Sequence, residues 1–223
     1  MIGDKVETIP NKLFSNTNLA EIQFGSSLQT KGEYAFSRCG ENITEFTIPA
    51  SVTTIGAYAF QNCSVLESVT IEGAPTIGNK AFYECAALKE IDLGGATEIG
   101  ESAFRGCTAL TQITIPDSVT VIGEEAFYGC EELASVGIGD GTQTISSRAF
   151  FNCRKLSEVT LGDGLLTIEG YAFNNCSALK TLTIPASVIK IERAAFAGVS
   201  FDSVIFEQPS GWTEVVTGEA IAR

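Results

Sequence analysis

A short alternation of apolar and polar residues recurs along the chain. The stretch Leu110-Thr-Gln-Ile-Thr-Ile115 is rich in β-branched residues and alternates in this way, which predicts a short strand. Pro116 ends this strand because it has no N–H for a ladder. Residues 119–122 are again apolar and extended. Ala103 to Cys107 carry apolar side chains at i, i+1 and i+4, which predicts a single helical or 3₁₀ turn with one buried face.

The phrase Ala-Phe-x-x-Cys occurs seven times, and its copies end at Cys39, Cys63, Cys85, Cys107, Cys130, Cys153 and Cys176. Two further copies lack the cysteine and end at Thr17 and Val199. The phenylalanines of the nine copies stand at positions 14, 36, 60, 82, 104, 127, 150, 173 and 196, so the period is 22 to 24 residues. Self-similarity at such a fixed period is typical of a solenoid.

One repeat cannot bury its apolar face alone, whereas stacked repeats bury it together. We therefore predict one α/β repeat solenoid of about nine coils over residues 1–206, with atypical first and last coils, and a capping tail over residues 207–223. The parallel sheet is expected on the concave side and the short helical turns on the convex side, because helical turns are wider than strands. Two ladders are predicted in the core, one of the repeated phenylalanines and one of Leu66, Leu88, Leu110, Leu133, Leu156 and Leu179.

The end coils depart from the repeat in a way that fits caps. Phe24 and Phe206 replace the aliphatic residue that closes the strand in the inner coils. Trp212 follows in the tail. We interpret this tryptophan as a cover for the last coil in preference to a binding anchor, because solenoids need such lids.

Charge limits the classes of partner. The net charge is −13, from 27 acidic and 14 basic residues, and no run of Lys or Arg is present. A surface this acidic repels phosphate backbones and anionic lipid headgroups, so we expect neither nucleic acid nor membrane surfaces as partners. No stretch approaches the ~18 apolar residues of a membrane span. The first residues lack the apolar core of a signal peptide, which predicts either a cytoplasmic protein or a mature or trimmed fragment.

The chain contains no histidine, which removes the commonest general base and the commonest metal ligand. We therefore expect no enzyme, no catalytic residue and no cofactor. The seven cysteines include no Cys-x-x-Cys pair, so a zinc site is not favoured. Stacked coils bring neighbouring cysteines within disulfide range, but identical residues in a parallel stack point the same way. Buried free thiols are favoured over disulfides, a metal site or a nucleophile.

The turn column holds Asp117, Asp140 and Asp163 in three consecutive coils. Stacked carboxylates beside glycines could hold a hard cation such as Ca²⁺. Asp and Gly are also the ordinary residues of solvent-facing turns, and this interpretation is favoured.

The outer positions of the strands are polar and mildly acidic, without an aromatic or arginine anchor in the inner coils. The tyrosines instead flank the Ala-Phe phrase: Tyr34, Tyr58 and Tyr171 lie two residues before the phenylalanine, and Tyr83 and Tyr128 lie directly after it. Phe151 shares the column of Tyr128 in the next coil. Some of these rings could simply cover the core edge. Tyr83, Tyr128 and Phe151 are the candidate partner-binding residues.

The unit Leu-x-x-Ile-x-Ile-Pro-x-Ser-Val-x-x-Ile-Gly-x-x-Ala-Phe-x-x-Cys resembles the BspA-type leucine-rich repeat, also found in the Treponema pallidum leucine-rich repeat protein. The resemblance covers essentially the whole chain. The asparagine ladder of ordinary leucine-rich repeats is absent, and the Pro-x-Ser-Val element is intact only at Pro49, Pro116 and Pro185. The resemblance implies a right-handed leucine-rich-repeat superhelix on a surface-exposed or secreted protein of a host-associated microbe.

The same resemblance implies a function. Relatives of this type attach to host extracellular-matrix glycoproteins or to other microbial cells, so the first hypothesis is a non-enzymatic, extracellular protein-binding or adhesion module. The alternative is a structural spacer or repeat segment of a larger surface protein that has no ligand of its own. The family carries no shared catalytic residues.

Overall fold

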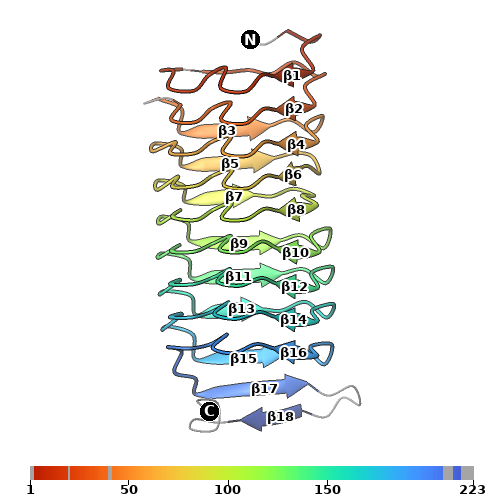
Figure 1. Cartoon of the computed structure of the whole chain (residues 1–223), viewed down its shortest axis with the longest axis vertical. Helices are drawn as coiled ribbons and strands as arrows, with labels where there is room; N and C mark the ends of the chain where they lie inside the picture. The colour runs from red at the N-terminus through yellow and green to blue at the C-terminus, as the bar shows by residue number, and fades with distance from the viewer. Residues whose placement is uncertain (1–2, 20, 40–41, 208–212, 217–223) are drawn as a thin grey trace.

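The computed structural model describes residues 3–19, 21–39, 42–207 and 213–216. They form a β-solenoid of about nine coils stacked along one axis (Figure 1). Nine strands are two residues long: β1 (Thr8–Ile9), β2 (Thr30–Lys31), β4 (Thr54–Ile55), β6 (Thr76–Ile77), β8 (Glu98–Ile99), β10 (Val121–Ile122), β12 (Thr144–Ile145), β14 (Thr167–Ile168) and β16 (Lys190–Ile191). The longer strands are β3 (Glu45–Ile48), β5 (Ser68–Ile71), β7 (Glu90–Asp92), β9 (Gln112–Ile115), β11 (Ser135–Ile138), β13 (Glu158–Thr160), β15 (Thr181–Ile184), β17 (Ser203–Glu207) and β18 (Thr213–Val216).

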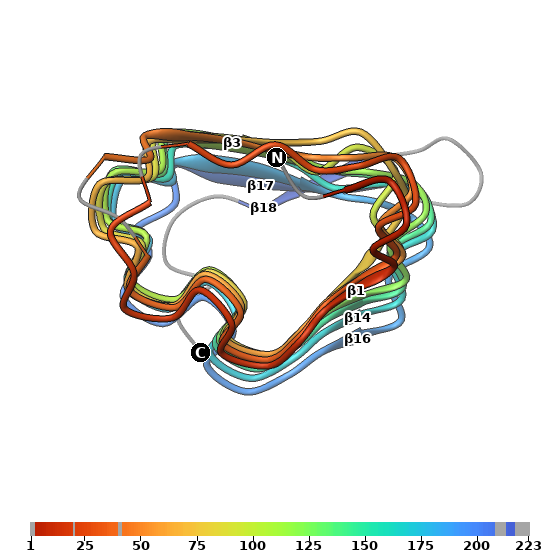
Figure 2. The same ribbon diagram turned by 90° about the horizontal axis from the view of Figure 1, so that it is seen from above.

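The strands build two walls (Figure 2). The short strands form one nine-stranded sheet, and each strand pairs in parallel with the short strand of the next coil, as Thr54 does with Thr76. The longer strands form three separate three-stranded sheets, β3-β5-β7, β9-β11-β13 and β15-β17-β18. Their side chains alternate between exposed and buried, so one face of each strand enters the core. The predicted parallel solenoid is therefore confirmed, with its parallel strands divided between two walls.

The predicted helical turns are wrong. No helix occurs in the parts of the chain that the structure describes, so these parts contain no helix long and apolar enough to cross a membrane. Each Ala-Phe phrase is instead a turn flanked by residues with positive φ, two before and two after the phenylalanine, such as Tyr58 (57°) and Asn62 (56°) around Phe60. Such φ values are uncommon for residues other than glycine. The apolar spacing was therefore interpreted as a helical turn, which has only negative φ values.

Hydrogen bonds between coils explain this backbone. The Phe36 N–H donates to the Ala59 carbonyl of the next coil at 2.7 Å, while the Ala35 N–H donates within its own turn to Gly32 at 3.2 Å. Alternate amides therefore point along the solenoid axis. A helix would use every amide internally and leave none for the neighbouring coil.

The core is a set of ladders, as predicted. The phenylalanines from Phe14 to Phe196 stack with centroids 5.0–5.5 Å apart and interplanar angles of at most 18°. This spacing is close to the ~4.8 Å between parallel strands and falls in the range that favours offset stacking. The predicted leucine ladder is also fully buried. Inter-coil pairing thus brings each ring onto its predecessor.

The sequence predicted that Phe206 and Trp212 belong to the cap at the C-terminal end. Phe206 is half-buried in β17, which pairs with β15 as a further parallel strand, and β18 then pairs with β17 in the antiparallel direction. The prediction for Trp212 lies outside the described residues.

We expect Phe104→Ala to lower the free energy of unfolding by about 3–5 kcal/mol, because the fully buried ring contacts both Phe82 and Phe127. Chemical denaturation followed by circular dichroism measures this change. Thr114→Ala, at an exposed position of β9, is the control and should change stability by no more than ~0.5 kcal/mol. Equal effects of the two substitutions would contradict the ladder as the main source of stability.

Candidate interaction surface

Two columns of side chains flank the buried phenylalanine ladder. The column two residues before the phenylalanine consists of Lys12, Tyr34, Tyr58, Lys80, Ser102, Glu125, Arg148, Tyr171 and Ala194. All nine of these residues have positive φ. The column directly after the phenylalanine consists of Ser15, Ser37, Gln61, Tyr83, Arg105, Tyr128, Phe151, Asn174 and Ala197. Because the coils stack in register, residues of one column are neighbours in space.

One stack crosses the middle coils. The Tyr128 and Phe151 rings are parallel within 3°, with centroids 4.9 Å apart. The Arg105 guanidinium lies over the other face of Tyr128, 4.2 Å from its centroid, and is paired with the Glu125 carboxylate. We call Arg105, Tyr128 and Phe151 the central stack.

A second stack crosses the first coils. The Tyr34 and Tyr58 rings lie 4.6 Å apart and are parallel within 3°. The Lys12 ammonium lies 5.5 Å from the Tyr34 centroid, and the Lys80 ammonium lies 5.8 Å from that of Tyr58. Lys80 is also 3.2 Å from the Glu101 carboxylate. We call Lys12, Tyr34, Tyr58 and Lys80 the N-terminal stack.

Both stacks leave ring edges, more than ring faces, to a partner. Within each stack a tyrosine is covered on one face by another ring and on the other by a cation. Such contacts contribute about 0.5–1.5 kcal/mol per aromatic pair and about 0.5–1 kcal/mol per exposed cation–π pair. These rings are half-buried and held in fixed positions. The stacks therefore stiffen the surface and offer rigid, partly apolar ridges.

The structure brings together two of the three predicted binding residues. Tyr128 and Phe151 are in contact, whereas Tyr83 makes no ring or cation contact among the described residues, and Arg105 stands between it and Tyr128 in the column. Sequence reasoning missed Arg105 and the pairing of Tyr34 with Tyr58. The repeat spacing could have found both, because each pair occupies one column in adjacent coils.

An exposed aliphatic pair was also missed. Ile189 is 82% exposed and Leu166 is 38% exposed, although both are large apolar residues. They occupy the same column, and the Ile189 N–H donates to the Leu166 carbonyl at 3.0 Å. The pair lies beside the short strands β14 and β16, away from the central stack.

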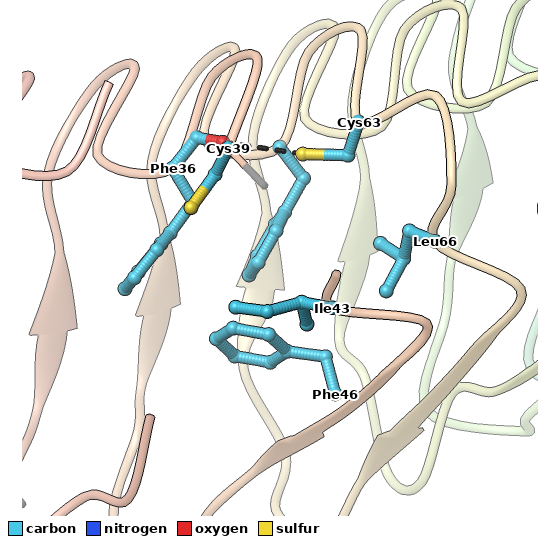
Figure 3. A pocket seen from close by; sticks show the side chains of 7 residues that line it. Phe36, Cys39, Ile43, Phe46, Cys63 and Leu66 are labelled. Carbon is cyan, nitrogen blue, oxygen red and sulfur yellow. Dashed lines mark hydrogen bonds between the residues drawn. The ribbon is translucent and has the colours of Figure 1, made fainter. Parts of the chain in front are cut away.

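The cysteines form a hydrogen-bonded ladder in the core. All seven are free and buried, which confirms the predicted unpaired thiols. The six from Cys63 to Cys176 each donate to the phenylalanine carbonyl of the preceding coil, at 3.0–3.3 Å. Figure 3 shows the first of these bonds, from Cys63 to Phe36. The Phe36 carbonyl also accepts the Cys39 N–H, so each thiol satisfies a second lone pair of a buried carbonyl.

Burial makes most of these thiols poor nucleophiles. Desolvation raises the pKa of Cys107 and of Cys176 to about 12, because the thiolate would lie in an apolar core. The interaction with the neighbouring Cys85 side chain lowers the pKa of Cys63, whereas burial raises the pKa of Cys85. A neutral thiol is needed as the donor to each carbonyl, so the ladder is a packing device.

The aspartate column is occupied by backbone contacts. The Asp140 N–H donates to an Asp117 carboxylate oxygen at 2.9 Å, and the Asp163 N–H donates to Asp140 at 3.0 Å. This geometry favours turn residues over cation ligands. Within the described ranges no group of three His, Cys, Asp or Glu side chains could hold a metal ion.

One small cavity lies in the core near the N-terminal end. It has a volume of about 10 Å³ and is lined by Phe36, Cys39, Ile43, Phe46, Phe60, Cys63 and Leu66 (Figure 3). A cavity of ~10–15 Å³ holds one water molecule at most. It is therefore too small for an organic ligand or cofactor.

A family model and the structure of a bacterial cell surface protein agree with the fold. The family model of the BspA type leucine rich repeat region, in six copies, matches residues 1–110 and 97–214. A leucine rich cell surface protein from Faecalibacterium prausnitzii A2-165 is 25% identical over 92% of this chain and 70% of its own, with a TM-score of 0.56. The T. pallidum leucine rich repeat protein is 28% identical over 60% of this chain and 56% of its own, with a TM-score of 0.47. A search of curated proteins found no match.

We expect a thiol reagent at pH 8 to leave the native protein unlabelled on the timescale of seconds, and to label seven cysteines after denaturation. The reason is that both burial and the raised pKa of residues such as Cys107 suppress the reactive thiolate. Mass spectrometry of the labelled protein counts the adducts. Rapid native labelling of Cys107, Cys130 or Cys153 would show that the ladder is open to solvent.

Proposed function

We propose, because the chain belongs to the BspA-type leucine-rich repeat family, that it is a non-enzymatic protein-binding module of a cell-surface or secreted protein. Its partner would be a protein or glycoprotein, such as a host extracellular-matrix glycoprotein or a component of another cell. The similar Faecalibacterium prausnitzii protein is described as a cell surface protein, which supports the proposed location.

The central stack carries this proposal. Arg and Tyr are enriched among residues that dominate binding energies, and Arg105, Tyr128 and Phe151 lie adjacent on consecutive coils. The underlying turns are fixed by inter-coil hydrogen bonds, including that from the Phe127 N–H to the Ala149 carbonyl at 2.7 Å. A ridge that is already ordered loses little conformational freedom on binding. Tyr83 extends the same column and belongs to the proposed surface.

The alternative function, a structural spacer, is favoured by a different observation. Tyr34 stacks on Tyr58, and Tyr128 stacks on Phe151, so these rings already contact one another within the chain. Several surface charges are also paired between coils, such as Lys89 with Glu67 at 2.7 Å. A surface that satisfies its own contacts needs no ligand. Binding experiments must therefore distinguish a spacer without a ligand from an adhesion module.

We also propose that residues 207–223 cap the C-terminal end. The antiparallel pairing of β18 with β17 supports this, because it covers a strand edge that would otherwise pair with another chain. Ending the chain after Glu207 should lower the midpoint of thermal unfolding and increase self-association, measured by calorimetry and by sedimentation. An unchanged midpoint and an unchanged sedimentation profile would rule out a capping role.

The binding surface is tested by the double variant Tyr128→Ala, Phe151→Ala. If the central stack binds the partner, saturable binding to immobilised matrix glycoproteins or to whole cells should weaken at least tenfold, because two anchors are removed. The matched control is Tyr34→Ala, Tyr58→Ala, which removes the equivalent stacked pair from the N-terminal stack.

The outcomes separate the hypotheses. Equal binding by both double variants would exclude the central stack as the contact surface. No saturable binding by the unmodified protein would favour the spacer. Circular dichroism of each variant confirms that the solenoid remains folded.

A further inference from the structure

A lysine occupies the core where every other coil has isoleucine. The second residue of the short strands is Ile9, Ile55, Ile77, Ile99, Ile122, Ile145, Ile168 and Ile191 in eight coils, and all of these except Ile191 are buried. In the second coil it is Lys31, which is 0% exposed. The register confirms the position, because Lys31 pairs with Ile9 on one side and with Ile55 on the other.

Four phenylalanine rings surround this side chain. The Lys31 ammonium nitrogen lies 4.5 Å from the ring centroids of both Phe24 and Phe46. It lies 5.4 Å from the centroid of Phe60 and 5.8 Å from that of Phe36. Phe46 stands where the next coil has a valine, since it pairs with Val69. The lysine and the extra rings thus occur together, at one level of the solenoid.

Among the residues that the structure describes, no charged or hydrogen-bonding partner reaches the amine. The Lys31 nitrogen is buried without a hydrogen-bond partner. The charged residues that the structure describes on the adjoining segments face solvent: Glu7, Glu21, Glu33, Arg38 and Glu45. The β4 strand contributes none. The other titratable groups nearby are the Cys39 and Cys63 thiols, which line the small cavity beside Phe36 and Phe46.

Desolvation outweighs the attraction of the rings. A buried ion without a partner loses its hydration shell, and contact with aromatic rings replaces only part of that lost hydration. Burial accordingly lowers the pKa of Lys31 well below its ordinary value. Burial without a partner therefore favours the neutral amine in the closed core.

The first coil is the part that can release it. It closes the cage from the N-terminal side through Phe24 and Ile9. Among the described residues between 3 and 28, only Ile9, Gly25 and Leu28 are buried. Regions with few buried contacts open at low free energy.

We propose that Lys31 makes the first coil a pH-sensitive latch, which closes over the neutral amine and opens more readily when acidification favours the protonated, solvated form. Opening exposes the β2 edge and the apolar rings of Phe36 and Phe46. The latch therefore exposes apolar core surface at the N-terminal end under more acidic conditions.

The direction of the pH dependence follows from linkage. The open state binds a proton at the ordinary pKa of lysine, about 10.4, and the closed state does so only at a lower pH. Between these two values, each unit of decreasing pH favours opening by up to tenfold. Above the open-state value the effect disappears, because both states are neutral.

Hydrogen exchange followed by mass spectrometry tests the latch. After correction for intrinsic exchange, the opening constant of residues 3–31 should rise up to tenfold per unit as pH falls from 9 towards 7. Lys31→Ile, which restores the residue of the other coils, should remove this slope and reduce opening at pH 7 by at least tenfold. Lys31→Met, of similar length, should behave in the same way, whereas the surface variant Lys89→Met should retain the slope.

Acylation of the unmodified protein gives an independent readout. Ordinary exposed amines react about tenfold more slowly for each unit of decreasing pH, because their neutral fraction falls. Lys31 should react slowly but at a nearly constant rate, since increased opening offsets the loss of neutral amine. A Lys31 rate equal to that of Lys89 at every pH, or an unchanged exchange slope in Lys31→Ile, would overturn the proposal.

Discussion

The hydrogen bonds that run from coil to coil set the geometry of the whole molecule. They fix the distance between neighbouring coils near 5 Å, so any residue type that recurs in the sequence must meet its own copy. Phe104 has to fit against Phe82 and Phe127, which favours a flat ring that stacks in offset fashion. The same constraint forces residues such as Tyr58 and Lys80 into positive φ, because only then does an amide of the turn reach the next coil. Local backbone strain of about 1–2 kcal/mol per residue is offset by buried pairing between coils.

Much of this architecture could be predicted from residue types and their spacing. The period, the phenylalanine and leucine ladders and the buried thiols all follow from apolar residues that return every 22 to 24 positions. The turn conformation could not be predicted in this way. Apolar spacing at i, i+1 and i+4 fits a helical turn and an alternating turn equally, and Tyr34 or Glu125 in the left-handed region is unfavourable by local preference. The deciding interaction joins residues 22 to 24 positions apart, which a local pattern does not contain.

The same reasoning explains what was predicted of the surface. Tyr128 and Phe151 were identified because both are aromatic and occupy one column in adjacent coils. The role of Arg105 was not predicted, because a charged residue was expected to face solvent. A guanidinium nevertheless packs on a ring as readily as another ring does. The burial of Lys31 was not predicted either, because a lone charged residue in a strand usually faces solvent. Its burial becomes evident only when the isoleucine column is aligned through all nine coils.

The cage around Lys31 also bears on how such a chain can grow. The coils that follow Phe60 present nearly identical ladders to both neighbours, so a whole unit could be duplicated or lost there without creating a mismatched interface. The first three coils lack this freedom. Phe24, Lys31, Phe46 and Phe60 come from the first three coils, so a coil inserted among them would separate the lysine from the rings around it. A duplicated unit would therefore fit in the middle of the solenoid, whereas one placed within the first three coils would disrupt the cage.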